Sequence, residues 1–475
     1  MIEKLNLTML ADFYEITMAN GYYCSGMADD TAYFDMFFRK VPDGGGYAIM
    51  AGLDQVIEYL ENLKFTDEDI EYLRSKKLFN EEFLRYLEDF QFSCDVWAVP
   101  EGTPIFPGEP VITVRGPVMQ AQFVETMILL LVNHQSLIAT KASRIVRAAA
   151  GRSVMEFGTR RAHGCSAANY GARAAYIGGC VGTACAITDR EFGVPALGTM
   201  AHSWVQMYDD EYEAFKKYAE IYPTNCVLLV DTFNVLKSGV PAAIKVFKEM
   251  KPEKMGIRID SGDIAYLTKN ARKMLDDAGL QDCSIVVSNS LDEYLIRDIL
   301  LEGACVDSFG VGERLITSRS EPVFGGVYKL AALEKDGRMI PKIKISENVG
   351  KITNPGFKHV YRLFDKDTDR MLADVIQLAD EMAPSEVYEI FDPDAVWKRK
   401  KLENFYAKNL REQIFDKGKC VYDRPSIDEI RDLCQRNLDA MWDEMKRFDN
   451  PQPYYVDLSY DLWKLKNDMI EANKR

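Results

Sequence analysis

The sequence is poor in the residues that build metal sites and covalent cross-links. It has four histidines among 475 residues, and its ten cysteines include no Cys-x-x-Cys pair. These residues offer neither a zinc site of the usual spacing nor a disulfide framework. Scattered thiols are typical of a reducing compartment, so we expect a cytoplasmic protein.

Long hydrophobic runs and excess basic charge are missing as well. The longest charge-poor apolar stretch, Met127–Val132, is far shorter than the ~18 residues of a membrane span. The first 23 residues carry acidic side chains and no basic leader, so we expect no signal peptide. Lys and Arg number 58 against 73 Asp and Glu, a net charge of −15. General binding to nucleic acid or to an anionic membrane is therefore disfavoured, and a phosphate-bearing ligand needs a local cationic cluster.

The remaining composition is that of an ordinary globular protein. Hydrophobic residues make up 47% and charged residues 28% of the chain, and the length predicts about three units of ~150 residues. Residues 92–118 are rich in Pro, Gly and β-branched side chains, which is typical of a small antiparallel sheet. We predict a β-rich N-terminal domain over residues 1–120, an α/β domain over 121–335, and C-terminal strands and helices over 336–475.

Beyond residue 152, short apolar strands alternate with helical segments. Four predicted strands have an apolar core with polar or glycine residues after it: Val227–Val230, Met255–Ile259, Ile285–Val287 and Val306–Phe309. The first residues after them lie 29, 28 and 22 positions apart, and they are Asp231, Asp260, Ser288 and Gly310. One strand–helix unit fills each interval, which predicts a parallel sheet, barrel-like or doubly wound, with its sites at the carboxyl ends of the strands. Ser290 and Glu293 predict a capping box for the helix after the third strand.

Several side chains at these strand ends suit an anionic ligand. Arg160, Arg161 and Arg258 supply planar forks for carboxylate or phosphate oxygens. Gly310 and Gly312 allow backbone amides to approach an anion closely, although a single Gly-x-Gly also occurs by chance. Phosphate is the ligand that this combination favours.

Two carboxylates and one histidine are the other candidates. Asp231 and Asp260 end neighbouring strands, so they could share a Mg²⁺ ion or hold a ribose hydroxyl; the alternative is that they cap helices or pair with arginines. His202 lies in a loop among small and hydroxylic residues, where a functional and a structural role are both open. His134, on an apolar helix, and His359, in a strand, are predicted to be structural, and the role of His163 stays open.

The order of the motifs resembles that of nicotinate phosphoribosyltransferases. The resemblance runs from Asp12-Phe13-Tyr14 through FFRKVP, EFGTRRAHG, GTMAHSWV, DTF, RIDSGD and VSNS to GGVYKL, and so covers most of residues 7–335. The family implies a type II phosphoribosyltransferase fold, an incomplete α/β barrel joined to an N-terminal β-rich domain. It also implies a homodimer with active sites at the subunit interface.

The resemblance further implies a reaction and its residues. The phosphoribosyl group of phosphoribosyl pyrophosphate passes to nicotinate in NAD salvage, giving nicotinate mononucleotide and pyrophosphate, with Mg²⁺ as cofactor and with ATP hydrolysis coupled through phosphorylated His202. By motif position, the nicotinate-binding residues are Tyr14, Thr199 and Arg258, with Tyr14 reaching the partner's site. The implied residues for phosphoribosyl pyrophosphate are Glu156, Arg160, Asp231, Asp260, Ser288, Asn289, Gly310 and Gly312. Asp231 and Asp260 are the candidate metal ligands.

One residue departs from the family pattern, and other functions stay open. Glu313 follows Gly312 where relatives commonly have Thr, so we expect its carboxylate to turn away from phosphate or to pair with Arg314. The alternatives are a nicotinamide phosphoribosyltransferase and a non-catalytic regulatory protein that binds sugar phosphates. A barrel aldolase or isomerase would need a lysine at a strand end, and none of the predicted strand ends has one.

Overall fold

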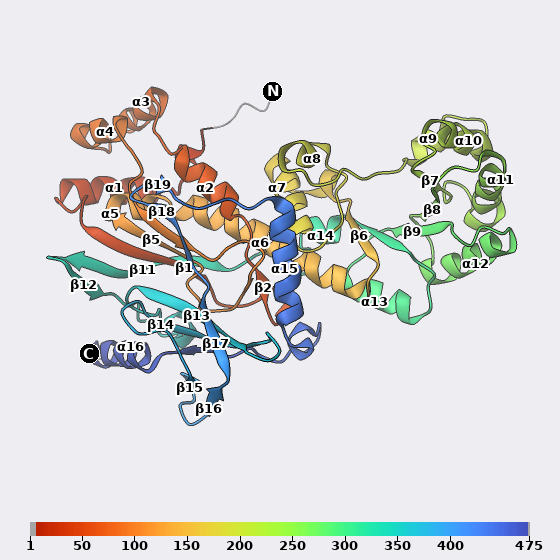
Figure 1. Ribbon diagram of the computed structural model, residues 1–475. Helices are drawn as coiled ribbons and strands as arrows, with labels where there is room; N and C mark the ends of the chain where they lie inside the picture. Colours follow the sequence, from red (N-terminus) through yellow and green to blue (C-terminus); the bar gives the residue numbers. More distant parts are fainter. Residues whose placement is uncertain (1–5, 474–475) are drawn as a thin grey trace. The chain divides into compact units, whose positions relative to one another are not determined.

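The computed structural model describes residues 6–473 and divides them into two compact units (Figure 1). The first unit combines the chain up to Ser136 with the chain from Val323 onward, and the second spans Leu137–Pro322. The predicted boundaries at residues 120 and 335 differ from these. Strand β11 (Gly326–Lys335) pairs antiparallel with β1 (Thr31–Phe38), which places it with the N-terminal region. The predicted N-terminal and C-terminal domains therefore form one unit.

The first unit is built on a seven-stranded sheet in the order β12-β11-β1-β5-β3-β18-β19. Its other strands are β3 (Asp95–Ala98), β5 (Ile112–Pro117), β12 (Arg338–Pro341), β18 (Glu412–Asp416) and β19 (Lys419–Cys420). Six of the eight residues of β1 are buried, namely Ala32–Met36 and Phe38. Since neighbouring residues of a strand point to opposite faces, other elements cover β1 on both faces. The Phe34 and Tyr328 rings of paired strands stack at 5.2 Å between centroids.

A second sheet of the first unit has the order β17-β13-β14-β20. Its strands are β13 (Lys358–Asp365), β14 (Met371–Leu378), β17 (Phe405–Asn409) and β20 (Val456–Leu458). Leu363, Val375 and Phe405 pack in its core with the hairpin β15 (Val387–Phe391) and β16 (Arg399–Glu403). Two residues form each strand of the small pair β2 (Ala48–Ile49) and β4 (Pro104–Ile105).

Helices complete the first unit. They are α1 (Phe13–Cys24), α2 (Leu53–Glu61), α3 (Asp67–Ser75), α4 (Glu81–Glu88), α5 (Val118–Phe123), α15 (Ile427–Ala440) and α16 (Tyr460–Ala472). Thr66 and Asp69 form a full capping box before α3, and Asn80 caps α4.

Helix α6 (Glu125–Ala148) follows α5 directly and crosses the boundary between the units. Together they form an apolar segment of 31 residues, Val118–Ala148, long and apolar enough to span a membrane, contrary to our expectation. It is 72% buried within the protein over its most apolar window, as is typical of the core helix of a globular protein.

The second unit contains a five-stranded, fully parallel sheet in the order β6-β10-β9-β8-β7. The strands are β6 (Ser153–Glu156), β7 (Cys226–Leu229), β8 (Met255–Ile259), β9 (Ser284–Ser288) and β10 (Ser308–Val311), which confirms the four strands predicted from the repeat. Its helices are α7 (Cys165–Ile177), α8 (Ala186–Phe192), α9 (His202–Gln206), α10 (Glu211–Ile221), α11 (Val240–Met250), α12 (Ile264–Asp277), α13 (Glu293–Leu301) and α14 (Glu313–Ile316). β6 and β7 do not pair with each other, so the barrel is incomplete.

The predicted capping box at Ser290 and Glu293 is wrong. Ser290 has φ +37°, outside the extended conformation of an N-cap, and the cap of α13 is Asp292, whose carboxylate accepts from Leu295 N at 2.9 Å. Glu293 is fully buried instead. The chain thus leaves β9 through a short left-handed turn before the helix begins.

Candidate active site

The carboxyl ends of the five parallel strands meet at one edge of the second unit's sheet, and most of the predicted site residues lie there. His202 opens α9 and is the residue on which they converge. Its Nδ1 lies 3.1 Å from Thr232 Oγ1, and its Nε2 lies 4.0 Å from Asp231 Oδ1 and 3.9 Å from Asp260 Oδ2. With 40% of its side chain exposed, the imidazole is open to a ligand.

The two aspartates form a connected network rather than helix caps. Asp231 Oδ2 accepts from Asp260 N at 3.1 Å and from Ser261 Oγ at 2.7 Å, while Ser288 Oγ donates to Asp260. Asp263 is the cap of α12, so Asp260 does not serve that purpose. Asp231 Oδ1 is buried and accepts no hydrogen bond from the described residues. A buried carboxylate oxygen without a donor is a site for a cation or a ligand hydroxyl.

Arg258 and Thr199 are also brought together. Arg258, in β8, donates through Nη1 to Thr199 Oγ1, and its buried Nε donates to none of the described residues. Burial lowers the pKa of Arg258, whereas the charges of Asp260 and Asp231 act in the opposite direction and that of Arg160 adds to the lowering. A partly desolvated guanidinium with a free N–H attracts an anionic ligand.

Glu156 has a different place from the one predicted by motif. Its carboxylate is fully buried, accepts from Thr183 Oγ1 at 2.6 Å, and accepts from Gly158 N. Burial raises its pKa, and these two donors partly offset the effect. Glu156 thus orders the turn that leads to Arg160, whose own side chain is exposed.

The loops after β9 and β10 carry the remaining predicted residues. Asn289 has φ +118° and Ser290 φ +37°, two non-glycine residues in the left-handed region, and such strain clusters at ligand sites. A side chain at Gly310 would overlap the Phe157 ring, so this glycine serves packing between β10 and β6. Gly312 is partly exposed, and a Cβ there would lie 3.3 Å from Phe157 O.

Glu313 turns out to pair with a different arginine from the one predicted. Its Oε1 lies 3.0 Å from Arg319 Nη1, whereas Arg314 pairs with Asp292. The expected partnership with Arg314 is therefore wrong, although Glu313 does have a cationic partner. Helix α14 begins directly after Gly312, at Glu313. Because consecutive residues of a helix point in different directions, Glu313 and Arg314 do not face each other.

Tyr14 lies in the first unit, near the start of α1, and its side chain is 43% exposed. Partial burial raises its pKa, and the carboxylate of Glu125 raises it further. His359 also lies in the first unit, in β13 as predicted, where burial lowers its pKa and Asn409 Nδ2 lies 3.3 Å from its Nδ1. His163 is exposed just before α7.

Two residues of the strand edge lie in motifs that the sequence analysis noted, but it assigned neither of them a place in the site. Thr232 contacts His202, and Ser261 donates to Asp231. Both directly follow an aspartate that ends a strand, and this position is the signal that could have identified them. No group of three or more His, Cys, Asp or Glu residues able to hold a metal occurs in the part of the chain that the structure describes.

Three family models match most of the chain. Residues 9–133 match the nicotinate phosphoribosyltransferase N-terminal domain, 152–368 the nicotinate phosphoribosyltransferase family, and 357–466 the C-terminal domain. Nicotinate phosphoribosyltransferase of Bacillus subtilis is 45% identical over 99% of this chain and 96% of its own length. The human enzyme is 31% identical over 97% of this chain and 96% of its own.

Solved structures confirm the predicted fold. Human nicotinic acid phosphoribosyltransferase superposes with a TM-score of 0.84 at 29% identity, covering 97% of this chain and 100% of that one. A nicotinate-nucleotide pyrophosphorylase from Pyrococcus furiosus shares the fold with a TM-score of 0.71 at 24% identity, over 93% of this chain and 97% of that one. The incomplete barrel with a β-rich N-terminal region is thus that of a type II phosphoribosyltransferase. Because family models match most of its length and a relative is 45% identical over 99% of it, the chain belongs to the nicotinate phosphoribosyltransferase family.

Proposed function

We propose that the protein transfers the phosphoribosyl group of phosphoribosyl pyrophosphate to nicotinate, coupled to ATP hydrolysis through a phosphohistidine. Family membership supports the transfer. The observation that carries the coupling is the position of His202, which is accessible and is held between Thr232 and two carboxylates. The products are nicotinate mononucleotide and pyrophosphate.

Arg258 and Thr199 are the proposed nicotinate-binding residues of the second unit. The free Nε–H of Arg258 suits the carboxylate of the pyridine acid, and a charge-assisted bond there is stronger than a neutral one. Nicotinamide lacks that charge, so the pair favours the acid over the amide. The ring nitrogen is already an unprotonated nucleophile near neutral pH, which leaves the protein the task of positioning it.

The transfer itself forms a bond from the pyridine nitrogen to the ribose C1′ and breaks the bond from C1′ to the pyrophosphate oxygen. Positive charge develops on the sugar, and carboxylates stabilise it. Asp231 and Asp260 are the proposed residues for the sugar. Arg160, Asn289, Ser288 and the backbone near Gly312 are the proposed phosphate ligands, whereas Glu156 and Gly310 act by shaping the loops.

His202 is the proposed phosphoryl acceptor, and its surroundings favour one ring nitrogen. Carboxylates 4.0 and 3.9 Å from Nε2 favour a proton on that atom. Nδ1 then keeps its lone pair and attacks the terminal phosphorus of ATP, and the bond to the ADP oxygen breaks. Water later cleaves the phosphorus–nitrogen bond and releases phosphate. The added charge of about −2 alters affinity for substrates and products, which draws the transfer forward.

Asp231 and Asp260 also fit a Mg²⁺ ion. Asp231 Oδ1 is buried without a donor, and both Asp231 Oδ1 and Asp260 Oδ2 lie near the same atom, His202 Nε2, at 4.0 and 3.9 Å. Mg²⁺ is commonly held by one or two carboxylates together with waters and substrate phosphates, so two suffice. When bound, the ion would neutralise charge on the leaving pyrophosphate.

We further propose a homodimer in which Tyr14 completes the partner's site, in a cytoplasmic enzyme. The exposure of Tyr14 near the start of α1 supports its availability to a ligand or to another subunit. All ten cysteines are free thiols, which suits a reducing compartment.

Product analysis tests this function. The protein is mixed with nicotinate or nicotinamide, phosphoribosyl pyrophosphate and Mg²⁺, with and without ATP, and mononucleotide and pyrophosphate are measured. We expect the acid to react, ATP to stimulate, and the amide to react poorly. A preference for the amide would favour the nicotinamide enzyme, and no pyrophosphate under any condition would favour a non-catalytic protein.

The substitution His202→Ala tests the coupling. We expect loss of ATP stimulation and of acid-labile phosphoprotein, while a slower ATP-independent transfer remains. That residual rate is the internal control for folding and substrate binding. Undiminished ATP stimulation in the variant would remove His202 from this role.

A further inference from the structure

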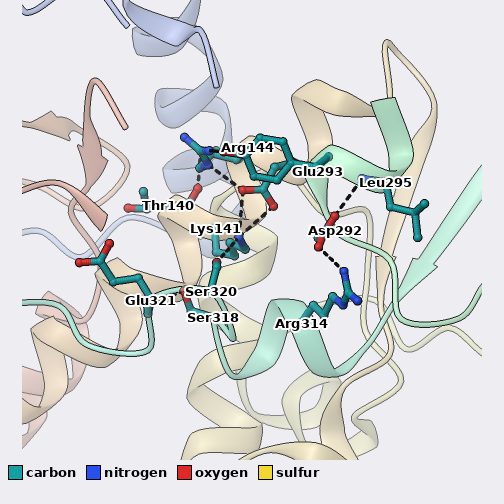
Figure 2. Close-up of polar contacts among 12 residues, drawn as sticks. Thr140, Lys141, Arg144, Asp292, Glu293, Leu295, Arg314, Ser318, Ser320 and Glu321 are labelled. Atoms are coloured by element: carbon teal, nitrogen blue, oxygen red, sulfur yellow. Dashed lines mark hydrogen bonds and ion pairs between the residues drawn. The ribbon is translucent and has the colours of Figure 1, made fainter. Parts of the chain in front are cut away.

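Two loops at the strand edge of the second unit are joined by an ion pair. The β9 loop, residues 289–292, ends at Asp292, and the β10 loop, residues 312–321, includes Arg314. Arg314 Nη1 pairs with Asp292 Oδ2, and the other oxygen of Asp292 caps α13 through Leu295 N (Figure 2). Their side chains are 31% and 19% exposed, so the pair is largely shielded from water. The carboxylate thereby serves both loops at once.

A second connection lies beneath the first. The buried carboxylate of Glu293, the first residue of α13, lies 2.9 Å from Lys141 Nζ and 2.9 Å from Arg144 Nε of α6. Lys141 Nζ also donates to Ser320 Oγ, in the β10 loop, at 2.8 Å. Figure 2 shows these side chains meeting between α6, α13 and the β10 loop. Helix α6 therefore holds Glu293, the residue after the β9 loop, and Ser320, near the end of the β10 loop, while Arg314 and Asp292 join the two loops directly.

The β9 loop needs such a restraint. Asn289 and Ser290 adopt left-handed backbone conformations that cost about 1–3 kcal/mol each, and such conformations persist only where the surroundings hold them. Asp292 is two residues from Ser290, and Arg314 is two residues from Gly312. The ion pair therefore joins a residue close to the strained turn of the β9 loop to a residue close to the glycine turn of the β10 loop.

We propose that Arg314 is a positioning residue for phosphoribosyl pyrophosphate, fixing the β9 loop against the β10 loop so that both bind the phosphoribosyl group together. The inference rests on the proposed function for the identity of the substrate. Arg314 acts through Asp292 and the two loops and makes no contact with substrate. Loss of Arg314 should therefore weaken the binding of phosphoribosyl pyrophosphate, which spans the two loops. The binding of nicotinate, assigned to Arg258 and Thr199, should stay nearly unchanged.

The test combines Arg314→Met, Asp292→Asn and the double variant. Methionine keeps much of the side-chain volume, and asparagine keeps the helix cap, so each removes mainly the ion pair. We expect each single variant to raise the KM for phosphoribosyl pyrophosphate about 10- to 100-fold, with the KM for nicotinate changed less than twofold. The double variant should be no worse than the more impaired single variant, because the two residues act as one.

Arg272→Met is the matched control for lost stability. Arg272 joins α12 to the opposite ends of the strands, pairing with Asp276 at 2.8 Å and donating to Cys283 O at 2.6 Å and Leu280 O at 2.7 Å. We expect it to lower Tm without changing either KM. If Arg314→Met changes both KM values and kcat alike, or only Tm, or if the double variant shows additive losses, the positioning role is wrong.

Calorimetry with ribose 5-phosphate separates this proposal from the proposed function. The compound carries the sugar phosphate but cannot react, so its binding reports on the loops alone. Binding by the wild-type protein and at least tenfold weaker binding by Arg314→Met would support the positioning role even without turnover. Equal binding by both would overturn it even if nicotinate mononucleotide is formed.

Discussion

Arg362 and Arg258, one in each unit, both lie near aspartates, but only Arg362 is hydrogen-bonded to its aspartate through two nitrogens. In the first unit, Arg362 donates to Asp374 through Nε at 2.8 Å and Nη2 at 2.6 Å, and Asp374 also accepts from Tyr454 at 2.9 Å. In the second unit, Arg258 Nε and Asp231 Oδ1 are buried without a partner among the described residues. Arg362 Nη1 is also buried without a partner among the described residues, but two other nitrogens of Arg362 bond to Asp374, whereas Arg258 donates to Thr199. The first cluster is therefore closed by its own ion pair, whereas the second leaves Asp231 Oδ1 without a donor, 4.0 Å from the accessible His202 Nε2.

The difference teaches how to separate charge that stabilises the fold from charge that binds substrate. A buried pair whose atoms bond to one another stabilises only in that geometry, and removing one member leaves an unpaired buried charge. A buried polar atom at the strand edge that has no partner lowers the stability of the fold. A ligand that bonds to this atom restores the lost stabilisation when it binds. Substitutions in the first cluster should therefore lower the free energy of unfolding, and substitutions in the second should weaken substrate binding.

The largest expected effect is on the stability of the first unit. Glu109 also faces this cluster, and burial together with Asp374 raises its pKa well above the ordinary value. In Asp374→Asn, Glu109 is free to ionise and replace the lost charge. The double variant Asp374→Asn/Glu109→Gln removes both carboxyls that face Arg362 and should cost about 3–5 kcal/mol in the free energy of unfolding.

Urea unfolding of the two single variants and the double variant measures this cost. Glu109→Gln is the matched control, because glutamine keeps the size of the side chain and leaves the Arg362–Asp374 pair in place, so it should cost far less than the double variant. If the double variant unfolds at the wild-type urea concentration, the Arg362–Asp374 pair does not stabilise the fold.

The next effect concerns binding in the second unit. Arg258→Ala should weaken nicotinate binding by about 2–4 kcal/mol, because a substrate carboxylate is left unpaired. Arg258→Lys keeps the charge but loses the planar fork, so it should recover only part of the affinity. Steady-state kinetics give the KM for nicotinate, and circular dichroism should show unchanged folding. An unaltered KM in Arg258→Ala would place nicotinate elsewhere.

The same contrast explains what sequence alone could predict. The alternation of apolar strands and polar ends located β7 to β10 and brought Asp231, Asp260 and Ser288 to one edge, because parallel strands align their carboxyl ends. His202 was assigned to the site by its motif, and it lies beside both aspartates. Local periodicity and short motifs were sufficient for these residues.

Long-range pairing was beyond the reach of the sequence pattern. β1 pairs with β11 across about 300 residues, as in Thr31 opposite Glu334, so the unit boundary could not be read from composition. The capping box failed for a related reason. Lys141 and Arg144 of a distant helix draw Glu293 into the interior, which leaves Asp292 as the cap. In both the predicted capping box and the predicted pairing of Glu313 with Arg314, ion pairs with residues distant in sequence outweighed the preference indicated by the local sequence.

The smallest expected effect comes from an exposed counterpart of the Arg362–Asp374 pair. On the β15–β16 hairpin, Arg399 Nη1 lies 2.8 Å from Glu389 Oε2, a distance similar to that of the buried pair, but the side chains are 51% and 52% exposed. Water and salt screen such a pair, so Glu389→Gln should cost less than about 1 kcal/mol in the free energy of unfolding. Glutamine leaves Arg399 over the Phe391 ring, 5.7 Å from its centroid, so the substitution isolates the charge. Urea unfolding at low and high salt measures the cost, which should shrink further as salt rises. A loss as large as that of the buried pair would mean that contact distance, and not burial, sets the stability of ion pairs in this protein.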